Sequence, residues 1–306
     1  MRFLLAGLIG LFAAHAAGAD EFYKGKTITV VTSTGAGGTY DLVARLIARH
    51  MPRHVPETPS MVVQNMPGGG NVLATNYLYN LAPKDGTVIG TINNAIPLHQ
   101  VIDGRGVRYD ADKFSWLGAT GSRNSIVIVA RSTGVRNIED MKHREVTLGG
   151  TGPASSIVIF PQAMNNLLGT RFKIVNGYSS SAEVYIAMEK GEVEARSGSY
   201  TDLMSEHADW VTGNKVVFLV QIGTKRDAAL AQVPLLTELA QNAEQRRIMT
   251  LISAPVALGQ PFLAPPGLPA ERALLLRHAF AETLADPAFL AEAAKLNVDD
   301  LAISAD

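Results

Sequence analysis

Residues 27–49 restrict the fold of this chain more than any other segment. They have the pattern of a strand, a loop of small residues and a helix. The strand, residues 28–32, is short and β-branched, as buried parallel strands are. The helix that starts at residue 39 places four apolar residues on one face: Leu42, Val43, Leu46 and Ile47. This unit predicts an α/β fold in which helices cover a parallel sheet.

The loop between this strand and helix is predicted to bind an anion. Its members are Ser33, Thr34, Gly35, Ala36, Gly37 and Gly38. The glycines let the backbone approach a ligand, and the helix points unpaired N–H groups and the positive end of its dipole at the same place. The loop lacks the Lys-Ser or Lys-Thr of a P-loop, and Tyr40 stands where a dinucleotide fingerprint needs a small residue. Uncharged donors suit a carboxylate better than a polyphosphate, and a tight turn without a ligand is the alternative.

The first 19 residues have the pattern of a secretory signal peptide. Arg2 precedes an apolar run over residues 3–14, and small residues at 17–19 offer a cleavage site. The run is too short for a membrane-spanning helix. We expect the mature, exported chain to begin at Asp20.

Composition predicts two globular domains. Of the 306 residues, 47% are hydrophobic and 18% are charged, which is enough material for two cores. Without Arg2 the chain has 26 basic and 28 acidic residues, and this balance argues against a nucleic-acid partner. The chain has no cysteine, which excludes thiol catalysis, disulfides and cysteine-ligated zinc.

Polar segments follow each predicted strand of the first domain. A second strand over residues 61–65 leads into the glycine-rich residues 67–71, and a third over residues 87–92 leads into Asn93 and Asn94. The carboxyl ends of parallel strands meet at one edge of a sheet, where ligands bind. We therefore place Asn93 and Asn94 beside the first loop in a ligand site.

The second half of the chain repeats the opening device. A strand over residues 146–149 and a helix from about residue 157 to 168 enclose a loop rich in glycine and hydroxyl residues. Its candidate ligand contacts are Thr151, Gly152, Ala154, Ser155 and Ser156. Taken alone, the loop also fits an ordinary serine cap. Two such loops in two domains favour a ligand held from both sides.

The order of the elements predicts two lobes, of which the first is discontinuous. We expect lobe 1 to comprise residues 20–116 and 224–306, and lobe 2 to comprise residues 117–223. In this scheme the strand over residues 216–220 returns the chain to lobe 1, and a two-segment hinge forms near residues 114–120 and 216–223.

Catalytic patterns in the sequence are weak. Pro52 interrupts the helix that would align His50 and His54 as a metal pair, and no metal site is predicted. Ser155 or Ser156 would need a histidine to act as a nucleophile, and no histidine lies in a loop that obviously reaches them. Arg123 and Arg196, near strand ends of lobe 2, have the chemistry to hold a carboxylate or to form surface salt bridges; Arg196 is taken into the candidate site.

Six motifs are spread over nearly all of the mature chain. They are residues 26–31 with 37–41, 65–71, 82–87, 151–156, Arg226 with 233–238, and 264–269. In their order and spacing, these motifs resemble those of the Bug-type (TctC-like) periplasmic solute receptors of tripartite tricarboxylate transporters. The chain departs from the family over residues 176–181 and 191–196, where Glu194 lies near the position of the family's aspartate and Arg196 is added.

The resemblance implies a type II-like periplasmic binding protein that closes on an organic carboxylate and delivers it to membrane permease subunits. It maps one ligand contact to residues 33–38, with Asp41 behind them, and another to residues 151–156. Because a carboxylate repels an anion, Asp41 caps the helix, orders a water or meets an amino or hydroxyl group of the ligand.

We therefore expect a monomeric periplasmic receptor that needs no cofactor and is not an enzyme. Two alternatives stay open at this point. One is a secreted hydrolase or transferase that uses Ser155 or Ser156. The other is a periplasmic partner that reports its ligand to a membrane sensor kinase.

Overall fold

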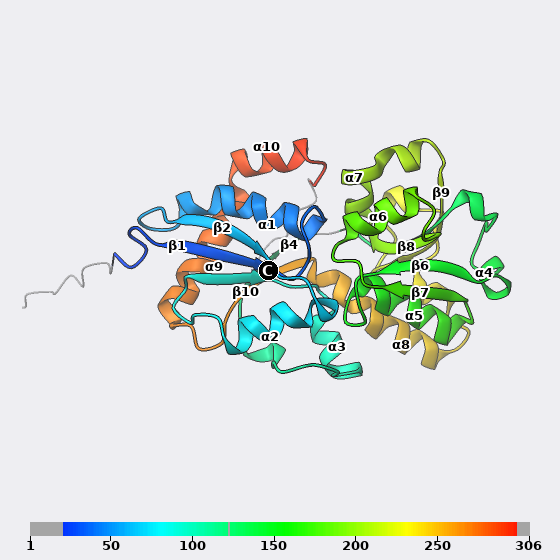
Figure 1. Ribbon diagram of the computed structural model, residues 1–306, viewed down its shortest axis with the longest axis horizontal. Coiled ribbons are helices and arrows are strands. Elements are labelled where there is room, and N and C mark those ends of the chain that lie inside the picture. The colour runs from blue at the N-terminus through cyan, green and yellow to red at the C-terminus, as the bar shows by residue number, and fades with distance from the viewer. Residues whose placement is uncertain (1–20, 122, 299–306) are drawn as a thin grey trace, which may run out of the picture.

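The computed structural model describes residues 21–121 and 123–298. The predicted signal peptide, residues 1–19, lies outside the described residues. Figure 1 shows two α/β lobes side by side. The first contains the blue and cyan elements together with the orange and red helices, and the second contains the green and yellow elements.

The first lobe is built on a five-stranded sheet in the order β2-β1-β3-β10-β4. Its strands are β1 (Thr27–Thr32), β2 (Ser60–Asn65), β3 (Val88–Thr91), β4 (Ser115–Thr120) and β10 (Gln260–Ala264). β1 runs parallel to β2 and β3, whereas β10 runs antiparallel to both β3 and β4. The sheet predicted to be parallel is therefore mixed, because β10 enters from the other lobe and runs in the opposite direction.

Helices cover both faces of this sheet (Figure 1). They are α1 (Thr39–His50), α2 (Val72–Asn80), α3 (Ile96–Ile102), α9 (Ala270–Ala285) and α10 (Pro287–Lys295). Phe262 of β10 packs in the core formed with α1, α9 and α10, and its neighbour Leu263 packs in the core beneath α2 and α3. This alternation follows from the two-residue period of a strand whose two faces are both buried.

The second lobe repeats the arrangement of the first. Its sheet has the order β7-β6-β8-β5-β9. The strands are β5 (Ser125–Ala130), β6 (Val146–Gly150), β7 (Phe172–Asn176), β8 (Ala195–Ser199) and β9 (Val216–Ile222). The helices are α4 (Asp140–His143), α5 (Ser156–Leu168), α6 (Ser181–Glu189), α7 (Tyr200–Thr212) and α8 (Ala243–Ser253). As in the first lobe, three parallel strands are followed by one antiparallel strand, here β5.

The chain returns to the first lobe later than predicted. β9 pairs with β5 inside the second sheet, so the prediction that residues 216–223 form a return crossing is wrong. Met249 of α8 also lies in the core of the second lobe. The return instead occurs at Gly259, and Gln260 pairs with Thr120 of the outgoing segment.

The two lobes touch through small residues. A Cβ on Gly70 would lie 2.7 Å from the Ala154 nitrogen, and a Cβ on Gly152 would lie 2.6 Å from the Gly70 nitrogen. Nearby, the Gly35 N–H donates to the Ser179 carbonyl at 2.8 Å. These backbone contacts mean that the structure represents the lobes in a closed arrangement.

Candidate functional site

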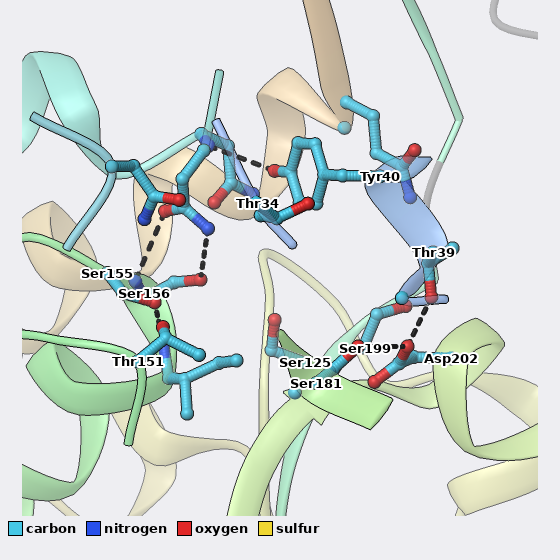
Figure 2. Close-up of a pocket in the computed structure, with 18 residues that line it drawn as sticks. Thr34, Thr39, Tyr40, Ser125, Thr151, Ser155, Ser156, Ser181, Ser199 and Asp202 are labelled. Carbon is cyan, nitrogen blue, oxygen red and sulfur yellow. Dashed lines mark hydrogen bonds between the residues drawn. The ribbon is translucent and has the colours of Figure 1, made fainter. Parts of the chain in front are cut away.

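A small cavity of about 60 Å³ lies where the lobes meet. Figure 2 shows hydroxyl-bearing side chains on several sides of it. The lining residues are Thr34, Gly38, Thr39, Tyr40, Asn71, Asn93, Asn94, Ser125, Thr151, Ser155, Ser156, Ile157, Ser181, Gly198, Ser199, Asp202, Gly259 and Gln260. Most of these side chains are neutral hydroxyls and amides. The cavity therefore offers many uncharged hydrogen-bonding groups from both lobes.

The wall from the first lobe is fixed by bonds between its polar segments. The Ser33 hydroxyl accepts from the Asn93 N–H at 3.2 Å, which aligns the end of β3 with the first loop. The Tyr40 hydroxyl, at the start of α1, accepts from the Asn94 N–H at 3.0 Å. Burial raises the pKa of the Tyr40 phenol well above its usual value, so Tyr40 stays a neutral donor.

Asn93 joins this wall to the second lobe. Its side-chain oxygen accepts from the Ser156 N–H at 3.1 Å, and its amide nitrogen lies 3.3 Å from the Ser156 hydroxyl. Ser155 caps α5 from within the second lobe by accepting from the Ile157 N–H. The first turn of α5 is thus capped by one residue from each lobe.

Asp202 is the one acidic residue among the cavity-lining residues that the structure describes. Its carboxylate accepts from Thr39 across the lobe contact, from Ser181 at 3.1 Å and from Arg196 (Figure 2 shows the first two bonds). Burial raises the pKa of Asp202, but the Arg196 charge and these hydrogen bonds lower it by more. The pKa is therefore below its usual value, and the carboxyl group is ionised. Arg196 thus neutralises Asp202 from behind the cavity.

Comparison with known proteins decides the family. The model of the tripartite tricarboxylate transporter family receptor matches residues 43–306. The chain belongs to this receptor family. A UPF0065 protein of Bordetella bronchiseptica is 24% identical over 293 residues, which cover 94% of this receptor and 82% of that protein. The family resemblance stated from the sequence is therefore confirmed.

Solved structures of binding proteins share the fold of this receptor. The periplasmic binding protein BugD has a TM-score of 0.72 at 20% identity, with 90% of this receptor and 88% of that chain covered. MatC from Rhodopseudomonas palustris, solved with bound malate, has a TM-score of 0.71 at 19% identity, with 89% of each chain covered. The two-lobed fold predicted from the sequence is confirmed, and these matches are receptors and binding proteins rather than enzymes.

Seven of the predicted ligand contacts line the cavity. They are Thr34, Gly38, Asn93, Asn94, Thr151, Ser155 and Ser156. Eight others do not line it: Ser33, Gly35, Ala36, Gly37, Asp41, Gly152, Ala154 and Arg196. Of these eight, Gly35, Gly37, Asp41 and Arg196 use polar atoms in contacts within the protein.

In the first loop, the backbone N–H groups of Gly35 and Gly37 donate to protein acceptors rather than facing the cavity as free donors. Gly37, whose φ of +88° favours glycine, donates its N–H to Asp41 at 3.0 Å, and the Gly35 N–H bonds the second lobe. Asp41 also accepts from Arg45 and Asn65. Against the effect of burial, these bonds lower the pKa of Asp41, so its negative charge orders the loop from behind the site.

In the second loop, Gly152 and Ala154 serve the contact between lobes. Ala154 is fully buried in a cluster with Val31 and Val72 of the first lobe. Arg196 is also displaced from its predicted role. It is 2% exposed, its guanidinium lies 3.5 Å from the centre of the Tyr185 ring, and it pairs with Asp202.

The sequence reasoning missed most of the second-lobe wall. The additional lining residues are Thr39, Tyr40, Asn71, Ser125, Ile157, Ser181, Gly198, Ser199, Asp202, Gly259 and Gln260. A usable signal existed for Ser199, because it is the last residue of strand β8 and caps α7 by accepting from the Thr201 N–H at 3.1 Å. Gln260 carried no such local signal, because its position depends on a strand that arrives from the other lobe.

Within residues 21–121 and 123–298, no cluster of three or more histidine, cysteine, aspartate or glutamate side chains has the geometry of a metal site. Over the same residues, no helix is both long enough and apolar enough to cross a membrane.

Glu206 makes the stability of the second lobe depend on pH. Burial and the neighbouring Asp202 raise its pKa from 4.5 to about 9, so it is protonated at neutral pH and bonds Asp202. Between pH 4.5 and about pH 9, the Glu206 carboxyl group keeps its proton in the folded protein and loses it in the unfolded chain. The free energy of unfolding therefore falls as pH rises, by up to about 1.4 kcal/mol per pH unit.

Glu206→Gln is expected to flatten this dependence, because a glutamine keeps a neutral donor beside Asp202 at every pH. Thermal unfolding followed by circular dichroism between about pH 5 and pH 8 measures it. The variant should gain melting temperature relative to wild type toward the alkaline end. Glu192→Gln, at an exposed site of the same lobe, is the matched control. Parallel curves for wild type and Glu206→Gln contradict the assignment.

Proposed function

We propose that this protein is a periplasmic receptor that binds a small organic carboxylate between its lobes and delivers it to the permease of a tripartite tricarboxylate transporter. The family match supports a receptor role. The signal-peptide pattern of residues 1–19 supports export. The helix N-termini around the cavity support an anionic ligand.

Four helices begin at the cavity. Gly38 and Ser155 are the N-caps of α1 and α5, Ser181 is the first residue of α6, and Ser199 is the N-cap of α7. Each helix presents the positive end of its dipole there. This convergence is the observation that carries the proposal, because it favours a negative group although the described lining residues include no lysine, arginine or histidine.

The structural neighbours support the same ligand class. MatC was solved with malate, and a second R. palustris protein with a TM-score of 0.67 was solved with adipate. Both ligands are carboxylates, and both proteins share the two-lobed fold of this chain.

A serine hydrolase is not favoured by the cavity. The Ser155 hydroxyl accepts from the Ile157 N–H, and the Ser156 hydroxyl is paired with Asn93. No histidine is among the described residues that line the cavity. Neither serine therefore has the adjacent base that a nucleophile needs.

The proposal is tested with a panel of acetate, succinate, L-malate, adipate and citrate in thermal-shift and small-angle scattering experiments. A ligand at about 100 times its dissociation constant adds about 2.7 kcal/mol to stability, which corresponds to a rise of roughly 5 to 10 °C for a chain of this size. The radius of gyration should fall as the lobes close. If no carboxylate of the panel raises the melting temperature, the proposed function is wrong.

Gly35→Ala tests whether binding needs closure. A Cβ at this position would lie 2.5 Å from the Ser179 hydroxyl and 3.1 Å from its carbonyl oxygen, both in the opposite lobe. We expect calorimetry to show about tenfold or greater weakening for any acid that binds the wild type, because overpacking resists closure. The melting temperature without ligand should stay close to that of wild type, since the clash arises only between lobes. Unchanged affinity argues against coupling of binding to this contact.

A further inference from the structure

A carboxylate of the second lobe accepts a hydrogen bond from the first lobe at the edge of the cavity. The Thr39 hydroxyl, on the first residue of α1, donates to Asp202, which lies in the first turn of α7 (Figure 2). Both residues line the cavity, and they are only 4% and 3% exposed. The bond therefore joins the two walls of the site within the buried contact between the lobes.

The second lobe holds this carboxylate in place by itself. Ser181, the first residue of α6, donates at 3.1 Å to the same oxygen as Thr39, and Arg196 donates to the other oxygen. Arg196 is fixed in turn, because its guanidinium stacks on Tyr185 and its Nε donates to the Ser197 carbonyl at 3.3 Å. All of these groups except Thr39 belong to the second lobe, so we expect the acceptor to keep its position when the lobes separate. Of the three donors, Thr39 is the one whose bond depends on closure.

Small residues allow Thr39 to reach this acceptor. A Cβ on Gly38 would lie 2.6 Å from the Ser181 hydroxyl, and a Cβ on Gly37 would lie 3.5 Å from the Ala182 Cβ. The start of α1 therefore packs directly on the start of α6, and at Gly38 there is no room for a side chain between them. This close approach of the two helix ends brings the hydroxyl within bonding distance of the carboxylate.

The charge of Asp202 distinguishes this bond from two other contacts between the lobes. The Asn93 side chain bonds Ser156, and the Gly35 N–H donates to the Ser179 carbonyl, so both of these contacts join neutral groups. A hydrogen bond to an ionised carboxylate is roughly twice as strong as one between neutral groups, and burial strengthens it further. The charged contact is therefore expected to stabilise the closed arrangement more than either neutral contact.

We infer that Thr39 and Asp202 form the latch that holds the lobes together around the ligand, with Asp202 as the positioning residue. The inference rests on the proposed function, and it gives two cavity residues a role that requires no contact with the ligand. The bond formed on closure adds to the affinity, because the closed state is the one in which the ligand touches both lobes. Affinity should therefore depend on this bond for every ligand, whatever its structure.

Thr39→Val tests the latch, because valine keeps the shape of threonine without its hydroxyl. Isothermal titration calorimetry is run with the acid of the carboxylate panel that binds most tightly and with two of its homologues. Loss of a bond to a charged group should weaken the binding of each acid roughly tenfold or more, and by the same factor within about twofold. Thr39→Ser, which restores the hydroxyl, should bind within about threefold of wild type. A factor that differs between the acids means that Thr39 acts by contacting the ligand, and it overturns the inference.

Ser181→Ala is the matched control, because Ser181 lines the same cavity and donates to the same Asp202 oxygen from within one lobe. Its bond exists whether the lobes are apart or together, so this variant should bind each acid within about threefold of wild type. Equal weakening in the two variants, or wild-type affinity in Thr39→Val, overturns the latch while leaving the proposed function intact. Thr39→Ala repeats the measurement if Thr39→Val fails to fold. If no acid binds the wild-type protein, the proposed function and this inference fail together.

Discussion

The close approach of the two lobes through residues without side chains is the constraint on which the site depends. Gly70 and Gly152 meet backbone to backbone, and Gly35 lies against Ser179. A side chain at any of these points would separate the walls and open the cavity to solvent. Protein interiors pack too densely to absorb such a change locally. The glycines of the ligand loops therefore act chiefly through the fit between lobes and only secondarily through contact with a ligand.

Charge in the site is arranged in layers around this fit. Helix N-termini and neutral hydroxyl groups face the cavity, while the ionised groups Asp41 and Asp202 are each held by an arginine, Arg45 and Arg196. The protein thus keeps its own carboxylates satisfied, so they do not compete for the donors that a ligand needs. The binding surface selects by hydrogen-bond geometry in a field of helix dipoles rather than by direct ion pairing.

Sequence reasoning succeeded where the signal was local. The strand, loop and helix of residues 27–49, the serine cap at Ser155 and the family motifs were all readable, and the structure contains each of these elements. It failed where position depends on distant partners. The sequence does not show that the chain stays in the second lobe after β9, where Met249 of α8 packs in the core. The cationic side chain of Arg196 does not reveal that Asp202 and Tyr185 will bury it.

Gln260 and Thr120 pair side by side where the two chain crossings meet, and Gln260 also borders the cavity. In a molecule that opens by rotation about its crossings, atoms close to the axis travel the shortest distance. A ligand bonded there stays with the first lobe as the second swings away. As the lobes open, ligand contacts far from the rotation axis break first, and contacts beside the chain crossings break last.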